Sequence, residues 1–214
     1  MQHSLPSQPL PSIASVKRVH GKAILTLSSG ESISMPRSML KERPYRSGTP
    51  FDPASHARFM KERAFAFALE KSISLLAARA RTEAEIVQAL RANAYPETAI
   101  ALVMAKLQDA GYIDDQSFAQ QWASSRAAKG LGSMRIRMEL RRKGLDTETI
   151  DSVVSSMDQD TLSEGALMAA QKAARGKNLS LPEDRKKVLA ALARRGYSYS
   201  VAKEALSQLI NEYE

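Results

Sequence analysis

The segment RIRMELRRKGL, residues 135–145, carries five basic side chains and one carboxylate in eleven positions. Guanidinium and ammonium groups bind phosphates and carboxylates, so these residues could recognise an anionic surface. If the segment forms a helix, Ile136 and Leu140 lie on its buried side and its polar side is almost entirely cationic. The spacing therefore predicts an amphipathic helix with one basic face.

An ordinary solvated helix is the competing interpretation of this segment. Cations stabilise the last turn of a helix and glycine commonly follows it, which accounts for Arg141, Arg142 and Gly144. It does not account for Arg135 and Arg137, because positive charge in the first turn opposes the helix dipole. We therefore favour a partner-binding surface.

Charge is segregated along the rest of the chain as well. Residues 126–145 contain seven Lys or Arg and one acid, and residues 172–195 contain eight Lys or Arg and two acids. Residues 146–164 contain six acids and no base, while the whole chain has a formal net charge of +8. Such a charge attracts nucleic acid or acidic protein surfaces. The predicted partner-binding residues are Arg126, Lys129, Arg135, Arg137, Arg141, Arg142, Lys143, Arg185, Lys186, Lys187, Arg194 and Arg195.

Residues that could support catalysis or bind a metal are sparse. The chain has no cysteine, and its histidines, His3, His20 and His56, lie in the proline-rich first part without the spacing of metal ligands. We expect these histidines to be solvated. Asp114 and Asp115 directly precede a predicted helix, where carboxylates cap free N–H groups. The sequence therefore predicts a protein that is not an enzyme and that holds no metal and no cofactor.

The aromatic and sulfur side chains also have a structural interpretation. Trp122, the single tryptophan, lies four residues after Phe118, so both share one face of a predicted helix. A base-stacking platform is conceivable there, but core packing of an amphipathic helix is favoured. The nine methionines are expected to fill the core.

Composition predicts a mainly α-helical protein. Hydrophobic residues make up 43% of the chain and aromatic residues 6%, and alanine and leucine, which favour helices, supply much of the apolar mass. There is no secretory signal pattern and no apolar run long enough to cross a bilayer. We therefore expect a cytoplasmic protein.

The first 56 residues differ from the remainder because seven prolines, at positions 6, 9, 11, 36, 44, 50 and 53, exclude a long helix. The alternation of apolar and polar residues in AILTLSSGESISM predicts a β-hairpin over about residues 16–35, with Ser-Ser-Gly-Glu as its turn. Residues 37–55 are predicted to be a linker. We assign residues 1–56 to an N-terminal arm.

From Ala57 onward the helical pattern repeats. When Leu90, Leu140 and Leu192 are aligned, each has a β-branched residue four positions before it and a very small residue four positions after it. The match continues into the following helix, which identifies an internal repeat. Each repeat is predicted to contain three short helices, and Thr82 and Glu85 have the spacing of a capping box. The predicted repeats cover residues 57–108, 109–160 and 161–214.

Residues 111–146, GYIDDQSFAQQWASSRAAKGLGSMRIRMELRRKGLD, closely resemble the RecX family of regulators of the RecA recombinase. The flanking repeats look like the first and third repeats of that family, so the resemblance spans about residues 57–212. The first repeat has Ala94 where the family favours glycine. The matching parts of the middle repeat are Gly111–Asp115, Phe118–Ala119, Ser125–Arg126, Gly132, Arg135–Ile136, Glu139–Leu140 and Lys143–Gly144.

The resemblance implies three tandem three-helix repeats that form an elongated curved array. It also implies a monomeric, non-enzymatic protein that binds the RecA filament on single-stranded DNA, with weak or indirect contact to the DNA. Such a protein would inhibit RecA's ATP hydrolysis, strand exchange and co-protease function in recombination, DNA repair and the SOS response.

Two other functions remain open from the residues themselves. A sequence-independent DNA-binding protein is one, because a helix, a glycine turn and a further helix loosely match a helix-turn-helix unit. A general helical adaptor for acidic proteins is the other, because the predicted N-terminal hairpin offers a strand edge for β-augmentation.

Overall fold

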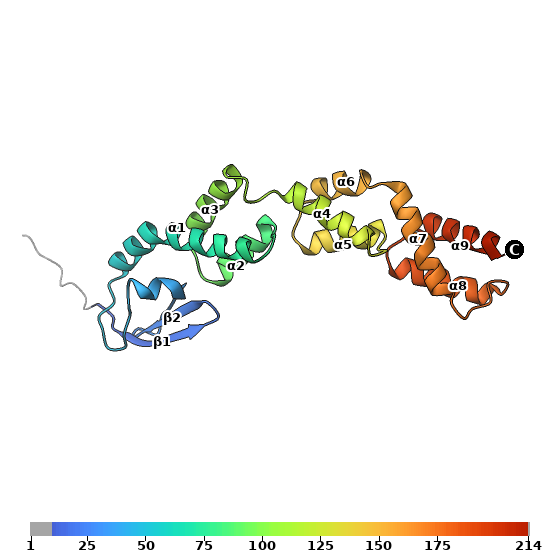
Figure 1. Cartoon of the computed structure of the whole chain (residues 1–214). Helices are drawn as coiled ribbons and strands as arrows, with labels where there is room; N and C mark the ends of the chain where they lie inside the picture. The colour runs from blue at the N-terminus through green and yellow to red at the C-terminus, as the bar shows by residue number, and fades with distance from the viewer. Residues whose placement is uncertain (1–9, 214) are drawn as a thin grey trace, which may run out of the picture. The chain divides into compact units, whose positions relative to one another are not determined.

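The computed structural model describes residues 10–213, which form a small sheet followed by helices (Figure 1). The chain divides into two compact units, the first ending at Ile113 and the second beginning at Asp114. The first unit holds the sheet and one three-helix repeat, and the second unit holds two further repeats. In the part of the chain that the structure describes, no helix is both long and apolar enough to span a membrane.

The sheet has three antiparallel strands, β1 (Ile13–Val19), β2 (Lys22–Leu27) and β3 (Ser32–Pro36), in the order β1-β2-β3. The β2–β3 pair is the predicted hairpin. The alternation of apolar and polar residues did not indicate β1 as a strand of its own, because a turn of only two residues, His20 and Gly21, joins β1 to β2. Both turn residues have positive φ, 36° and 85°, as short hairpin turns require.

Residues 37–52 pack into the first unit instead of forming an open linker. They include the 3-10 helix η1 (Arg37–Lys41), whose Met39 is fully buried, and Phe51, which is 1% exposed. An isolated bridge pairs Ser12 with Pro50. Prolines exclude a long helix here, but they do not prevent short segments from burying their apolar side chains.

His56 is buried in the first turn of α1 (Pro53–Ala78), so its predicted solvated position is wrong. Its Nδ1 lies 2.7 Å from the Tyr45 hydroxyl, and the ring packs against Phe51. The guanidinium of Arg43 donates to the Ser55 carbonyl at 2.7 Å. Burial, and secondarily the positive charge of Arg43, lower the pKa of His56 below its ordinary value, which keeps the imidazole neutral.

The lowered pKa of His56 predicts that the first unit loses stability in acid. Below about pH 6.5 the unfolded chain binds a proton on this histidine that the folded chain does not bind, so the unfolding free energy falls as pH decreases toward the folded pKa. Hydrogen exchange of the β2 amides (Lys22–Leu27), measured across this range, checks this expectation. A His56→Gln variant is the control. An equal loss of protection in both proteins would contradict the assignment.

The first repeat consists of α1, α2 (Glu83–Ala92) and α3 (Glu97–Asp109). The second repeat consists of α4 (Asp115–Ala127), α5 (Ser133–Arg142) and α6 (Thr147–Ser155). The third repeat consists of α7 (Gln159–Ala174), α8 (Pro182–Arg194) and α9 (Tyr199–Tyr213). The aligned leucines Leu90, Leu140 and Leu192 are all fully buried, at the same position in the second helix of each repeat. The predicted repeat is therefore confirmed.

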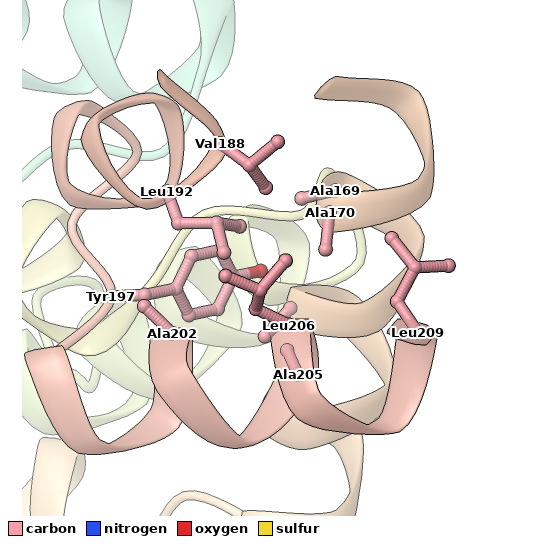
Figure 2. Close-up of a cluster of buried hydrophobic side chains, with 10 residues drawn as sticks. Ala169, Ala170, Val188, Leu192, Tyr197, Ala202, Ala205, Leu206 and Leu209 are labelled. Atoms are coloured by element: carbon pink, nitrogen blue, oxygen red, sulfur yellow. The ribbon is translucent and has the colours of Figure 1, made fainter. Parts of the chain in front are cut away.

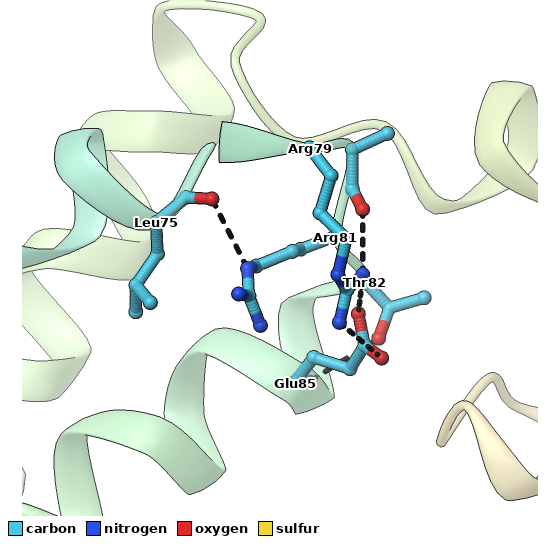
Figure 3. Close-up of polar contacts among 6 residues, drawn as sticks. Leu75, Arg79, Arg81, Thr82 and Glu85 are labelled. Carbon is cyan, nitrogen blue, oxygen red and sulfur yellow. Dashed lines mark hydrogen bonds and ion pairs between the residues drawn. The ribbon is translucent and has the colours of Figure 1, made fainter. Parts of the chain in front are cut away.

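The corner between α1 and α2 shows how side chains fix the helix ends (Figure 3). The Thr82 hydroxyl accepts from the Glu85 backbone N–H at 3.2 Å, which is the predicted threonine cap. The Glu85 carboxylate pairs with Arg79 at 2.9 Å, and the Arg81 side chain donates to the Leu75 carbonyl at 3.1 Å. In the next repeat, Asp114 caps α4 as predicted by accepting from the Ser117 N–H.

The core of the third repeat is built mainly from small and branched side chains (Figure 2). Val188 and Leu192 of α8 face alanines of α7 and Leu206 and Leu209 of α9. Tyr197 also enters this core, and its buried hydroxyl has no hydrogen-bond partner among the described residues. Burial raises the pKa of Tyr197, so its hydroxyl stays protonated.

The second helix of each repeat ends in a left-handed residue. Ala94 after α2 has a φ of 61°, and the aligned Gly144 and Gly196 have φ values of 83° and 89°. Glycine adopts this conformation without strain, whereas an L-residue with a Cβ does so at a cost of about 1–2 kcal/mol. The first repeat therefore carries backbone strain that the other two avoid.

Replacing Ala94 by glycine is expected to raise the unfolding free energy by about 1 kcal/mol, because the strain disappears while the turn is kept. Urea unfolding measures the change. The reverse substitution, Gly144→Ala, is expected to lower the unfolding free energy by a similar amount and serves as the matched control. A destabilised Ala94→Gly protein would show that the alanine methyl group contributes packing that outweighs the strain.

Candidate partner-binding surface

α5, the helix that holds most of the predicted cations, is fixed at its N-terminal end by the third repeat. No side chain caps this end. Instead, the Gly132 N–H donates to the Arg195 carbonyl at 2.9 Å, and the Met134 N–H donates to the Gly196 carbonyl at 3.1 Å. The carbonyl groups at the C-terminal end of α8 thus satisfy free N–H groups at the start of α5.

This junction needs glycine on both sides. A Cβ on Gly196 would lie 2.3 Å from the Arg135 backbone nitrogen, and a Cβ on Gly132 would lie 2.3 Å from the Gly196 carbonyl oxygen. Both distances are far below van der Waals contact. The side chain of Arg195 also donates to the Gly130 carbonyl at 3.2 Å, so this predicted partner-binding residue contributes to the junction.

The two sides of α5 differ as the sequence predicts. Ile136 and Leu140 are fully buried, and Arg141 and Arg142 are exposed. Met134 and Met138, however, are 58% and 46% exposed, so the expectation that methionines fill the core is wrong for these two. They lie one helical turn apart, and they place apolar surface beside the cations.

Trp122 of α4 packs against the core of the second repeat, as favoured from the sequence, and is surrounded by polar groups. Its indole N–H donates to Glu139 at 3.2 Å, and the Arg126 guanidinium lies 4.1 Å from its ring centroid. Arg126 also pairs with Glu139 at 2.7 Å, and Arg135 lies 3.4 Å from the same carboxylate. Although burial acts to raise it, hydrogen bonding and charge from Arg126 hold the pKa of Glu139 below its ordinary value.

Two further cations of this region have partners within the second repeat. Arg137 pairs with Asp151 of α6. The Lys143 ammonium lies 4.8 Å from the centroid of the Trp122 ring, a cation–π contact. These contacts hold the two cations against their own repeat.

In the third repeat, the cations of α8 are mostly exposed. Lys187 pairs with Asp184 at 2.6 Å, and the Arg185 guanidinium donates to the Leu179 carbonyl. Lys186 and Arg194 are exposed and form no ion pair with any described residue. The same is true of Arg141 and Arg142 in α5 and of Lys129 in the loop before it. Thus at least four of the twelve predicted residues, Arg126, Arg135, Arg137 and Lys187, are in internal ion pairs.

The loop between α7 and α8 adds two cations that we did not assign from the sequence. Arg175 and Lys177 line a pocket of about 400 Å³ together with Arg185. Both belong to the basic run 172–195, so the sequence contained the signal. Across residues 10–213, no cluster of three or more His, Asp or Glu side chains could hold a metal ion.

Comparison with known proteins identifies the family. Models described as the first, second and third three-helix domains of RecX match residues 68–107, 114–154 and 163–206. The regulatory protein RecX of Mycobacterium sp. (strain KMS) is 35% identical over 178 residues, which cover 80% of this chain and 94% of that protein. The chain belongs to the RecX family.

Other members agree with this assignment. The regulatory protein RecX of Mycolicibacterium smegmatis is 38% identical over 149 residues, covering 66% of this chain and 79% of that protein. A crystal structure of regulatory protein RecX aligns with a TM-score of 0.62 at 24% identity and covers 91% of this chain and 98% of its own. RecX from Lactobacillus salivarius aligns with a TM-score of 0.64 at 20% identity, covering 68% and 96%. The predicted fold of three-helix RecX repeats is confirmed.

Proposed function

We propose that this RecX family member is a non-enzymatic regulator that binds the RecA filament on single-stranded DNA and inhibits RecA's ATP hydrolysis, strand exchange and co-protease activity. It binds through the basic face of the second and third repeats. The observation that supports this most directly is the exposure of Arg141 and Arg142, without an internal ion pair, on a helix that is fixed by its neighbours. The relatives are named regulatory proteins, which supports regulation rather than catalysis.

The chemistry of this face suits an acidic protein surface. Cations without an internal partner keep their full attraction for an anionic partner and accelerate association. Met134 and Met138 add adaptable apolar area next to Arg141 and Arg142. Arginine and methionine are both enriched in the buried centres of protein interfaces.

The backbone junction between α5 and α8 links the two helices that carry most of the predicted cations. The N–H groups of Gly132 and Met134 bond to carbonyl groups at the end of α8, so backbone hydrogen bonds tie the start of α5 to the end of α8. A surface that is already ordered binds with a smaller entropy cost than one that is ordered on binding.

The test is a titration of RecA ATP hydrolysis on single-stranded DNA with this chain. We expect hydrolysis to fall at substoichiometric amounts of the protein. The DNA concentration is then raised at constant protein. Inhibition that persists supports filament binding, whereas inhibition that disappears would show that the chain only sequesters DNA. Unchanged hydrolysis at equimolar protein would refute the proposal.

A further inference from the structure

The first unit contains a cleft of about 470 Å³ between the sheet and the first helical repeat. Four of its lining residues are cations that come from three separate elements, Arg18 of β1, Arg37 and Lys41 of η1, and Lys71 of α1. No carboxylate is among the lining residues. We propose that this cleft binds the phosphate groups of a single-stranded nucleic acid.

The walls of the cleft are fixed by short contacts. The β1–β2 turn lies against the α2–α3 turn so closely that a Cβ on Gly21 would be 1.8 Å from Oδ1 of Asn93. The Arg37 backbone N–H donates to the Gly21 carbonyl at 2.8 Å. The Ser38 hydroxyl lies 3.1 Å from the Tyr95 hydroxyl, which donates to the Phe67 carbonyl at 3.2 Å. The elements that carry the cations are therefore held together by contacts within the first unit.

The hydroxyl of Tyr95, one of the residues that line the cleft, is held in its protonated form. Burial is the main cause of its raised pKa, and the carboxylate of Glu70 contributes to the same effect. A protonated hydroxyl can donate to Phe67 while it stays in contact with Ser38. Glu70 itself does not line the cleft.

The four cations are left without internal acidic partners. None of them forms an ion pair with a described residue. Other arginines of the same unit do pair, since Arg63 contacts Glu42, Arg79 contacts Glu85 and Arg91 contacts Glu97. Four cations without an ion pair thus line one cleft, where they repel one another unless an anion is bound.

The position of Arg18 strengthens this interpretation. It is paired with Ala23, which is fully buried on the face of the sheet that packs against the helices. Lys17, its neighbour in the strand, points to the opposite face because side chains alternate along a strand. Arg18 therefore lies on the packed face of the sheet, and its side chain is among those that line the cleft.

The lining identifies phosphate as the ligand chemistry. Guanidinium groups bind phosphate oxygens in a bidentate manner, and the Asn93 amide, which donates one N–H to the Ala89 carbonyl, has a second N–H to donate. The one aromatic side chain in the lining, Tyr95, is 6% exposed, so it offers no face on which a base could stack. Binding through phosphates alone is independent of sequence and depends strongly on salt.

The experiment measures the binding of a short fluorescein-labelled oligo(dT) to the full-length chain by fluorescence anisotropy over a series of salt concentrations. The variant Arg37→Ala/Lys41→Ala removes two exposed cleft cations. Lys17→Ala/Lys61→Ala removes two exposed cations of the same unit outside the cleft and is the matched control. Both pairs are also made in a chain carrying Arg141→Glu/Arg142→Glu, so that the basic face of the second repeat does not mask the effect.

We expect the cleft variant to bind roughly tenfold more weakly and its salt slope to fall by about 1.4, because each phosphate that is no longer neutralised lowers the slope by about 0.7. The control variant is expected to match the wild-type chain. Equal losses in both variants, or no loss in the cleft variant, would overturn the proposal. If the cleft variant still inhibits RecA, the nucleic-acid proposal for the cleft is unaffected. The cleft and the proposed function are therefore tested separately.

Two further ligands identify the source of the phosphate. Inorganic phosphate and dTMP are titrated as competitors of the oligonucleotide. Weak competition at millimolar concentrations is expected for a strand-binding cleft. If either competitor binds the wild-type chain as tightly as the oligonucleotide does, and this binding is lost in Arg37→Ala/Lys41→Ala, the cleft is a site for a small phosphate ligand and the nucleic-acid assignment is wrong.

Discussion

Reversing the charge of Arg141 and Arg142 is expected to raise the concentration needed for half-maximal inhibition of RecA at least about tenfold, which corresponds to about 1.4 kcal/mol of binding free energy. Both side chains are exposed, and neither makes an ion pair with a described residue, so the fold loses only their favourable interaction with the C-terminal end of the helix dipole. A glutamate at these positions would repel an acidic filament surface and slow association. The measurement is the titration of RecA ATP hydrolysis on single-stranded DNA.

The control for this variant is Lys106→Glu/Lys203→Glu, which changes the net charge by the same amount at exposed positions of α3 and α9. A general electrostatic attraction would be weakened equally by both variants. A surface centred on α5 responds to the first variant alone. Normal inhibition by Arg141→Glu/Arg142→Glu would refute the assignment of α5 to the interface.

Arg126 and Arg135 are poor choices for the same experiment. Both contact Glu139, and Arg126 also packs over Trp122. Removing either cation leaves a partly buried carboxylate with fewer partners, which destabilises the fold. A loss of inhibition in such variants would therefore combine a stability effect with a binding effect.

Replacing Gly196 by alanine is expected to destabilise the second unit by about 2–5 kcal/mol, because the new methyl group adds both left-handed strain and overpacking. Its φ is 89°, and its Cβ would overlap the Arg135 backbone nitrogen. The bond from the Met134 N–H to the Gly196 carbonyl would be broken or distorted. Urea unfolding monitored by Trp122 fluorescence measures the change.

The matched control for this stability effect is Gly176→Ala. Gly176 has a φ of 72° but no atom within 4 Å of the position of its Cβ. This variant is expected to lose about 1–2 kcal/mol from strain alone. If both variants lose the same free energy, the packing between the second and third repeats contributes nothing beyond the turn itself.

The Gly196→Ala variant also tests whether RecA inhibition depends on the spacing between the cations of α5 and those of α8. When the junction opens, α5 and α8 no longer share backbone hydrogen bonds, so their cations lose their fixed spacing. We expect inhibition of RecA to weaken even at temperatures where both repeats stay folded. Full inhibition by a folded Gly196→Ala protein would show that each repeat binds independently.

The sequence alone determined the repeats and much of their local geometry. The periodicity of apolar residues placed Leu90, Leu140 and Leu192 in the core, because helical spacing is a property of residues close together in the chain. Aligning Ala94 with two glycines marked a turn that proved to be left-handed in all three repeats. Asp114 and Thr82 were recognisable as caps because capping also acts over a few residues.

Only the tertiary structure decided which cations have internal partners. Arg126 is 13 residues from Glu139, and Arg137 is 14 residues from Asp151, on different helices in both cases. An ion pair forms only when side chains meet at a few ångströms, and helix packing, not sequence spacing, sets that distance. The cleft of the first unit could not be recognised from the sequence for the same reason. Its cations at positions 18, 37, 41 and 71 form no run in the sequence, and folding of the sheet onto α1 brings them together.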